Sequence, residues 1–383
     1  MRFLVLVCFL LTVESLVLRG KRERKSPKEY KKFYALDYPQ EPLIWEANIG
    51  TPLSSSTKQR PYRLSVEIAR LDIWTLAPTY PSLTADNQIY DHSKSKTSYY
   101  YNPYSGELSV LGLHQSSLGS TGVFNLRGYY FADVFALNNE TVFEQVIGNV
   151  QFADGNPDSW LNPEFEDIDG ALGLGWDPAM YFADPDFKSN PILNILHYDK
   201  TVQGYFYIVW IGKQNDWQVS FGVMDDQHCE SDYQMVNLDY AYEENVMAVY
   251  IDSFTFGDYS SNNAYAAVDT GSPIVYMPEE AYLEISINIG ATYDYASGLY
   301  VVDCADAVNF DPWVFTINSI DYKIKSSSYI VDLGLGGGEC VVAFGITDST
   351  TISWILGYPW LTEYCTRVDV VGYGTIGFSK SKN

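Results

Sequence analysis

The 383-residue chain has few histidines and lacks several common catalytic motifs. Its four histidines (His92, His114, His197, His228) show no H-x-x-x-H spacing, which argues against a zinc peptidase of that type. The G-x-S-x-G turn of α/β-hydrolases is missing as well. The glycine-rich residues 334–338 are not followed by the Lys-Ser/Thr of a phosphate-binding loop, and indicate a flexible turn. We therefore expect no metal and no cofactor.

Positive charge is also scarce. The chain holds 24 Lys and Arg against 48 Asp and Glu, a formal net charge of -24. Nucleic-acid phosphates would repel such a surface, so no nucleic-acid partner is expected. Nine of the basic and three of the acidic residues fall within residues 1–33, which leaves 15 and 45 for the remainder. A surface this acidic repels itself at neutral pH, and the repulsion is lost as carboxylates protonate. This favours a protein that works in an acidic compartment. A soluble acidic secreted protein is the alternative interpretation.

Long apolar runs are absent, since no segment reaches the roughly 20 apolar residues that span a bilayer. The apolar residues 3–13 behind Met1-Arg2 instead predict a signal peptide over residues 1–15. Secretion or lysosomal delivery without a membrane span follows. Asn139-Glu140-Thr141 is a glycosylation acceptor that fits this route.

Cysteine is sparse but suits an oxidising compartment. Of five cysteines, Cys8 would leave with the signal peptide, and an even number remains. None of the four (Cys229, Cys304, Cys340, Cys365) lies in a C-x-x-C pair, so disulfides are favoured over a zinc or redox site.

The basic run at residues 19–32 is expected to be mobile because it has little apolar content. Multibasic stretches attract processing proteases, so the run indicates a short pro-segment. A solvated N-terminal tail is the alternative.

From about residue 43 the chain shows the pattern of a mainly β protein. Short apolar or alternating runs rich in aromatic and β-branched residues are separated by Gly, Pro, Asn and Asp. Examples are residues 108–113, 142–150, 204–211 and 217–223. Long amphipathic helices are scarce, and short helices are predicted over residues 191–198 and 278–289.

One aspartate lies in a turn suited to holding a carboxylate. An apolar run delivers Asp269 to Thr270-Gly271-Ser272, and a second apolar run leads away. Glycine permits a tight turn, and hydroxyl and backbone N–H groups can hydrogen-bond the carboxylate. An ordinary hairpin turn is the alternative interpretation.

The chain also contains a weak internal echo. A strand–turn–strand element at residues 64–74 is followed by residues 169–175 (Asp-Gly-Ala-Leu-Gly-Leu-Gly). A second such element at residues 266–278 is followed by residues 354–357 (Trp-Ile-Leu-Gly). The similar spacing predicts two related lobes that share a large interface.

These segments together resemble the pepsin-like aspartic peptidases, and an invertebrate, nematode-like member among them. The similar segments, in chain order, are residues 48–52 (Asn-Ile-Gly-Thr-Pro), 62–78, 169–176, 269–272, 315–330 and 355–378. The resemblance implies a mainly β, two-lobed fold with a central peptide-binding cleft. It also implies a disulfide between Cys304 and Cys340, with Cys229 and Cys365 as an additional pair. The implied division is a signal peptide (1–15), a basic pro-segment or tail (16–42), and lobes at 43–213 and 214–383.

The family mechanism needs two carboxylates that share one proton around a water molecule. Asp269 matches one of them, but the other is replaced. Where the family has Asp-Thr-Gly-Ser-Ser-Asn-Leu-Trp, this chain has Glu-Ile-Ala-Arg-Leu-Asp-Ile-Trp, with Trp74 fixing the register. Glu67 therefore falls on the first catalytic position, and Ile68, Ala69 and Arg70 replace the hydroxyl and glycine residues of the turn.

The resemblance further implies substrate-binding roles for Thr270, Gly271 and Ser272. It places Gln115 where the family has a tyrosine over the cleft. The implied partner is a peptide or protein bound by a monomer.

Three functions remain open from the sequence. The first is a secreted homologue that has lost or greatly reduced its peptidase activity but still binds peptide. The second is an active acid endopeptidase that uses a Glu67/Asp269 pair. The third is a secreted inhibitor or structural protein without a functional cleft.

Overall fold

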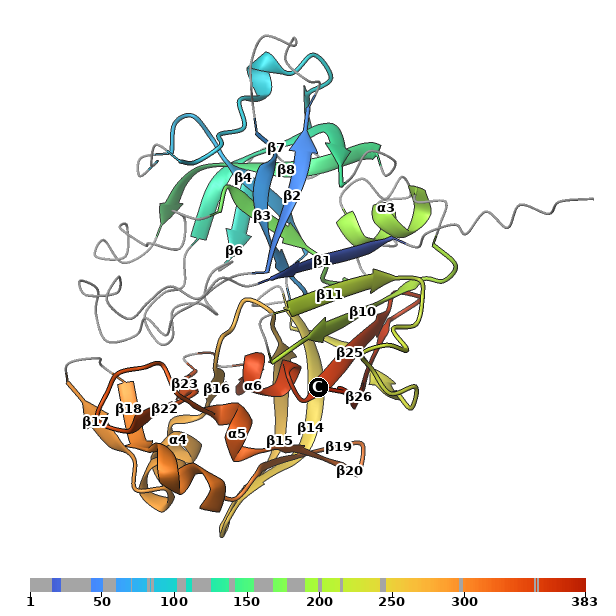
Figure 1. Ribbon diagram of the computed structural model, residues 1–383. Helices are drawn as coiled ribbons and strands as arrows, with labels where there is room; N and C mark the ends of the chain where they lie inside the picture. The colour runs from blue at the N-terminus through green and yellow to red at the C-terminus, as the bar shows by residue number, and fades with distance from the viewer. Residues whose placement is uncertain are drawn as a thin grey trace, which may run out of the picture.

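The computed structural model describes residues 16–21, 43–50, 60–69, 71–80, 83, 86–101, 108–111, 125–137, 142–154, 168–177, 190–198, 202–213, 216–241, 246–295, 299–347, 349 and 351–383. Within these residues the chain forms two β lobes with a sheet between them (Figure 1). The predicted mainly β, two-lobed fold is confirmed.

The first lobe is an eight-stranded sheet in which β7 and β8 form a long antiparallel ribbon. Its strands are β2 (Ile44–Ile49), β3 (Tyr62–Glu67), β9 (Gly170–Gly173), β4 (Ile73–Leu76), β8 (Val142–Asp154), β7 (Asn125–Ala136) and β5 (Tyr99–Tyr100), with β6 (Leu108–Leu111) paired to β7. The 3-10 helix η1 (His92–Lys94) and the helix α3 (Pro191–Tyr198) accompany it.

The second lobe has an eight-stranded and a four-stranded sheet. The larger contains β20 (Ile320–Ile324), β19 (Trp313–Ile317), β14 (Val246–Phe256), β15 (Tyr259–Val268), β24 (Trp354–Leu356), β16 (Val275–Met277) and β23 (Phe344–Ile346), with β13 (Asp239–Ala241) paired to β14. The smaller contains β17 (Thr292–Asp294), β18 (Leu299–Asp303), β22 (Glu339–Val342) and β21 (Ile330–Val331). Its helices are α4 (Glu279–Asn288), η4 (Cys304–Asn309), α5 (Ser326–Tyr329) and α6 (Tyr358–Leu361).

A six-stranded sheet lies between the lobes and joins segments far apart in the sequence (Figure 1). Its order is β1 (Val17–Lys21), β11 (Asp216–Phe221), β10 (Phe206–Ile211), β25 (Tyr364–Asp369), β26 (Thr375–Lys380) and β12 (Gln234–Asn237). The predicted lobe boundary at residues 213 and 214 falls in the connection between β10 and β11, and it stays a prediction.

Strand β1 corrects one expectation from the sequence. Residues 19–32 were expected to be mobile, but residues 19–21 pair antiparallel with β11. The reason is the alternation of the segment: Leu16 and Leu18 are buried in the core, while the guanidinium of Arg19 donates to Gln218 at 2.6 Å. Residues 22–32, like the predicted signal peptide, lie outside the described residues.

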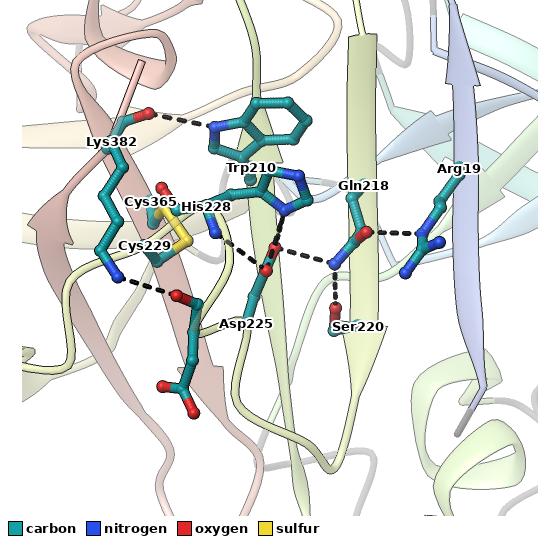
Figure 2. A network of polar contacts seen from close by, with 11 residues as sticks. Arg19, Trp210, Gln218, Ser220, Asp225, His228, Cys229, Cys365 and Lys382 are labelled. Atoms are coloured by element: carbon teal, nitrogen blue, oxygen red, sulfur yellow. Dashed lines mark hydrogen bonds and ion pairs between the residues drawn. A yellow bond between two sulfur atoms is a disulfide. The ribbon is translucent and has the colours of Figure 1, made fainter. Parts of the chain in front are cut away.

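Buried polar contacts continue from β1 into the second lobe (Figure 2). Gln218 donates to the Asp225 carboxylate at 2.8 Å, and Asp225 also lies 2.9 Å from Nδ1 of His228. The disulfide between Cys229 and Cys365 adjoins this network and ties it to β25. The network thus connects the first described strand to the last part of the chain.

Several local predictions are confirmed. The two helices expected at residues 191–198 and 278–289 are present as α3 and α4. Both implied disulfides form, Cys229–Cys365 and Cys304–Cys340.

Candidate active site

The internal echo in the sequence corresponds to the same strand arrangement in each lobe. In the first lobe β3 pairs parallel with β9, and β9 pairs antiparallel with β4. In the second lobe β15 pairs parallel with β24, and β24 pairs antiparallel with β16. The strands after the turns also match, since β4–β8 and β16–β23 are both parallel pairs. The predicted relationship between the lobes is therefore present in the fold.

This repeat places Glu67 at the position equivalent to Asp269. On β3, Val66 faces Leu172 and Glu67 faces Gly173. On β15, Val268 faces Leu356, and the N–H of Asp269 donates to the Leu356 carbonyl at 3.1 Å, just before Gly357. The strand register therefore aligns Glu67 with Asp269. The register that Trp74 fixes in the sequence gives the same alignment.

The two turns contact each other across the lobe boundary through Thr270. Its buried hydroxyl donates to the Val66 carbonyl at 2.7 Å and accepts from the Ile68 N–H at 3.2 Å. Both partners immediately flank Glu67 in the sequence. One hydroxyl of the second turn thus holds the backbone around the first turn in place.

Asp269 is held by groups that follow it in its own turn. Oδ1 accepts from the Gly271 N–H at 2.9 Å, and Oδ2 accepts from the Ser272 hydroxyl at 3.0 Å. The side chain is nearly inaccessible, with Asp269 4% exposed. A buried carboxylate needs such donors because an unpaired one is costly to desolvate. Gly271 and Ser272 thus organise the turn around Asp269, while the substrate-binding roles of Thr270, Gly271 and Ser272 stay a prediction.

Glu67 has a different environment. It is 1% exposed, and its Oε1 accepts a hydrogen bond from the Ser65 hydroxyl at 3.1 Å. Ile68 and Ala69, which are both buried, carry no hydroxyl. Sequence reasoning missed Ser65. Its signal was a serine between Leu64 and Val66, two residues before an acid.

The segment that supports Glu67 is fixed by an ion pair between the buried Asp169 and the partly exposed Arg60. Asp169, just before β9, accepts from both terminal nitrogens of Arg60, at 2.5 and 2.9 Å. It also accepts from the N–H groups of Arg63 and Gln88 at 2.7 and 2.6 Å. The hydrogen bond to Asp169 raises the pKa of Arg60 above its ordinary value. These contacts align the start of β3 with β9, the strand that faces Glu67.

Comparison with known proteins decides the family. The sequence pattern of the family described as eukaryotic aspartyl protease matches residues 72–381. The chain belongs to this family. The match includes Asp269 and begins five residues after Glu67, beyond the altered part of the first turn.

Individual relatives extend the similarity. Aspartic protease 1 of Caenorhabditis elegans is 26% identical over 363 residues, which cover 90% of this chain and 83% of that protein. Aspartic protease 10 of the same organism is 30% identical over 267 residues, or 67% of this chain and 58% of that protein. Pepsin A of Bos taurus is 26% identical over 262 residues, or 66% and 64% of the two chains. The predicted pepsin-like, nematode-like resemblance is confirmed.

The structure does not describe every residue that the sequence singled out. Gln115, Arg70 and Asn139 lie outside the described residues. One group of potential metal ligands occurs among the described residues, namely Cys304, Asp332 and Cys340. Because the two sulfurs are bonded to each other, this group is a disulfide beside a carboxylate rather than a metal site.

Proposed function

We propose that this chain is a secreted aspartic peptidase homologue with lost or strongly reduced peptidase activity and a retained peptide-binding cleft. One observation carries the proposal. Glu67 occupies the position equivalent to Asp269, in a turn where Ile68 and Ala69 stand in place of a hydroxyl residue and a glycine.

The chemistry of the family explains why this change matters. Two carboxylates close enough to share a proton provide one base and one acid, because like charges at that distance cannot both ionise. The base activates a water for attack on the peptide carbonyl, and the acid donates a proton. Glutamate moves the carboxylate by about one methylene, and a misplacement of about 1 Å can cost about 100-fold in rate. Ala69 also removes the freedom that glycine gives a tight turn.

Peptide binding has separate support in the second turn. Asp269 keeps its donors from Gly271 and Ser272, and Thr270 still joins the turn to β3. Peptide binding between the lobes depends on the two turns being held together, whereas proton sharing is needed only for cleavage. The proposed ligand is a peptide or protein bound by a monomer, with Gln115 as a further proposed contact.

An active endopeptidase with a Glu67/Asp269 pair is the second candidate. It is favoured by the burial of both carboxylates in adjoining turns joined through Thr270. Glutamate keeps acid–base chemistry, so the pair retains the right functional groups.

Digestion of a denatured protein at about pH 3 to 6, where a shared-proton pair works, distinguishes these candidates. We expect no turnover, or turnover at least about 100-fold below that of an active relative. Cleavage that a statine-type transition-state analogue inhibits and that Asp269→Asn abolishes would establish the second candidate instead. Binding of the analogue without turnover supports the proposal, and its failure to bind would favour an inhibitor or structural protein.

The proposed location is the extracellular space or the lysosome. The predicted signal peptide and the two disulfides support this route. In the described part of the chain, no helix combines the length and the apolar character needed to cross a membrane. The glycosylation proposed at Asn139 would accompany secretion.

A further inference from the structure

Ser65 contacts the carboxylate that distinguishes this chain from its family pattern. Its hydroxyl donates to Oε1 of Glu67 at 3.1 Å, and both residues are buried at 1% exposure. The two residues are separated by one position on β3, so their side chains leave the strand on the same face. The glutamate is therefore hydrogen-bonded back along its own strand.

The second lobe provides an internal comparison. The position equivalent to Ser65 is Ala267, because Ser65 faces Ala171 on β9 and Ala267 faces Ile355 on β24. There the acid is held from the other side, by Gly271 and Ser272, which follow Asp269. In the first lobe a hydroxyl thus precedes the acid, whereas in the second lobe a hydroxyl follows it.

The geometry of a strand links the serine to the length of the acid. Alternate residues on a strand lie about 6.7 Å apart along it. A serine hydroxyl and a carboxylate bridge that distance more readily when the acid carries an additional methylene. Glu67 has that methylene. The shorter side chain of an aspartate at the same position would reach the Ser65 hydroxyl only if it pointed straight along the strand toward Ser65.

We propose that Ser65 is a positioning residue for Glu67 and that the two form a matched pair. Ser65 takes over the holding role that hydroxyls of the turn have in the second lobe. The glutamate side chain is the one long enough to use it. A buried carboxylate is thereby kept hydrogen-bonded in a turn that has lost its own hydroxyl groups.

The consequence for activity rests on the proposed function. Oε1 of Glu67 accepts from a donor on its own strand, so this contact draws the carboxylate toward β3. Proton sharing depends on placement to within about 1 Å. The Ser65 contact thus adds a second reason for reduced turnover beside the changes at Ile68 and Ala69.

A double-mutant cycle on the full chain tests the pair. The variants are Ser65→Ala, Glu67→Asp and the double variant, with the ratio of folded to unfolded protein taken from urea unfolding near neutral pH. We expect Ser65→Ala to lower that ratio about tenfold with Glu67, the loss expected for one buried hydrogen bond. With Glu67→Asp the same change should lower it less than about twofold. Equal losses in both backgrounds would overturn the proposal.

A spectroscopic measurement separates positioning from packing. The carboxyl ¹³C signal of Glu67, assigned by its loss in Glu67→Gln, should move in Ser65→Ala and stay in Ser65→Thr, which keeps the hydroxyl. Ser286→Ala is the matched control, since it removes another buried hydroxyl, one that donates to the Tyr282 carbonyl. An unmoved signal in Ser65→Ala would overturn the pairing. Failure of every variant to bind the statine-type analogue would refute the proposed peptide binding, while this signal still decides the role of Ser65.

Discussion

At the scale of single residues, Thr270 is the contact on which the site depends. Its hydroxyl both donates to Val66 and accepts from Ile68, so one side chain of the second lobe orders the backbone next to Glu67. Ile68 follows Glu67 as Thr270 follows Asp269. A hydroxyl residue at position 68 could bond the backbone of the second turn in the same way, but isoleucine has no hydroxyl. The link between the turns is therefore one-sided.

Replacing Thr270 by valine keeps its shape and removes both hydrogen bonds. We expect Thr270→Val to lower the free energy of unfolding by about 1–3 kcal/mol, because a buried carbonyl and a buried N–H lose their partner. Urea denaturation measures the change. Thr316→Val is the matched control, since its hydroxyl bonds the Asp321 carboxylate at an exposed site and should change stability by less than about 0.5 kcal/mol. Equal effects of the two variants would contradict the role given to Thr270.

At the scale of elements, the chain on the far side of each turn packs against a glycine: Gly170 at the start of β9, and Gly357 just after β24. A Cβ at Gly170 would lie 1.9 Å from the Trp74 carbonyl oxygen. A Cβ at Gly357 would lie 2.2 Å from the carbonyl oxygens of Ser272 and Ile274. In both lobes, then, backbone in or after the turn lies directly against the glycine, which leaves no room for a side chain.

The variants Gly170→Ala and Gly357→Ala should therefore each destabilise the protein by at least about 3 kcal/mol, because backbone must move to admit the methyl group. Thermal unfolding followed by circular dichroism would report the loss. Gly257→Ala serves as the control: no atom lies within 4 Å of its added Cβ, so only its left-handed backbone is penalised, by about 1–2 kcal/mol. Tolerance of alanine at Gly170 or Gly357 would show that the facing strands are not packed as described.

The elements also show how far the sequence alone could lead. The turn at Asp269 and the Leu-Gly pairs at residues 172–173 and 356–357 carry short-range signals, and the two-lobed fold was predicted from them. The place of Glu67 was predicted from the register that Trp74 fixes. Strand β1 was missed because its basic residues were judged by composition. The alternation of Leu16, Leu18 and Gly20 was the better indicator, since Gly20 lies against the ring of Trp217.

Ser65 marks a different limit of the sequence. A serine between two apolar residues of a strand has no partner that sequence spacing identifies, because the contact depends on the side-chain conformation of Glu67. The correspondence with Ala267 follows from the alignment of Glu67 with Asp269, and the pairing of β9 and β24 with β3 and β15 agrees with it. Lone polar residues in buried strands next to acids are the signal that could have suggested it.

At the scale of the whole molecule, burial of tyrosine sets an upper pH limit on stability. Desolvation raises the pKa of Tyr80, Tyr322 and Tyr364 to about 12. In the unfolded chain these phenols ionise near 10. The folded state therefore favours the neutral phenol, and this stability is fully present below about pH 10 and is lost as pH rises through about 12.

An absorbance titration of phenolate in the folded protein should accordingly show a group of tyrosines that ionises only near pH 12, together with unfolding. The same titration in concentrated denaturant is the control, and there all tyrosines should ionise together near pH 10. A folded protein that titrates completely near pH 10 would contradict the burial of these rings.

The central claim concerns the whole site: the first turn, and not the second, limits peptidase activity. Its most direct test is the triple variant Glu67→Asp, Ile68→Thr, Ala69→Gly, assayed for digestion of a denatured protein at about pH 3 to 6. We predict cleavage at least about 100-fold faster than in the unaltered chain, inhibited by the statine-type analogue and abolished by adding Asp269→Asn. Cleavage by the unaltered chain at the same rate, equally dependent on Asp269, would contradict the account.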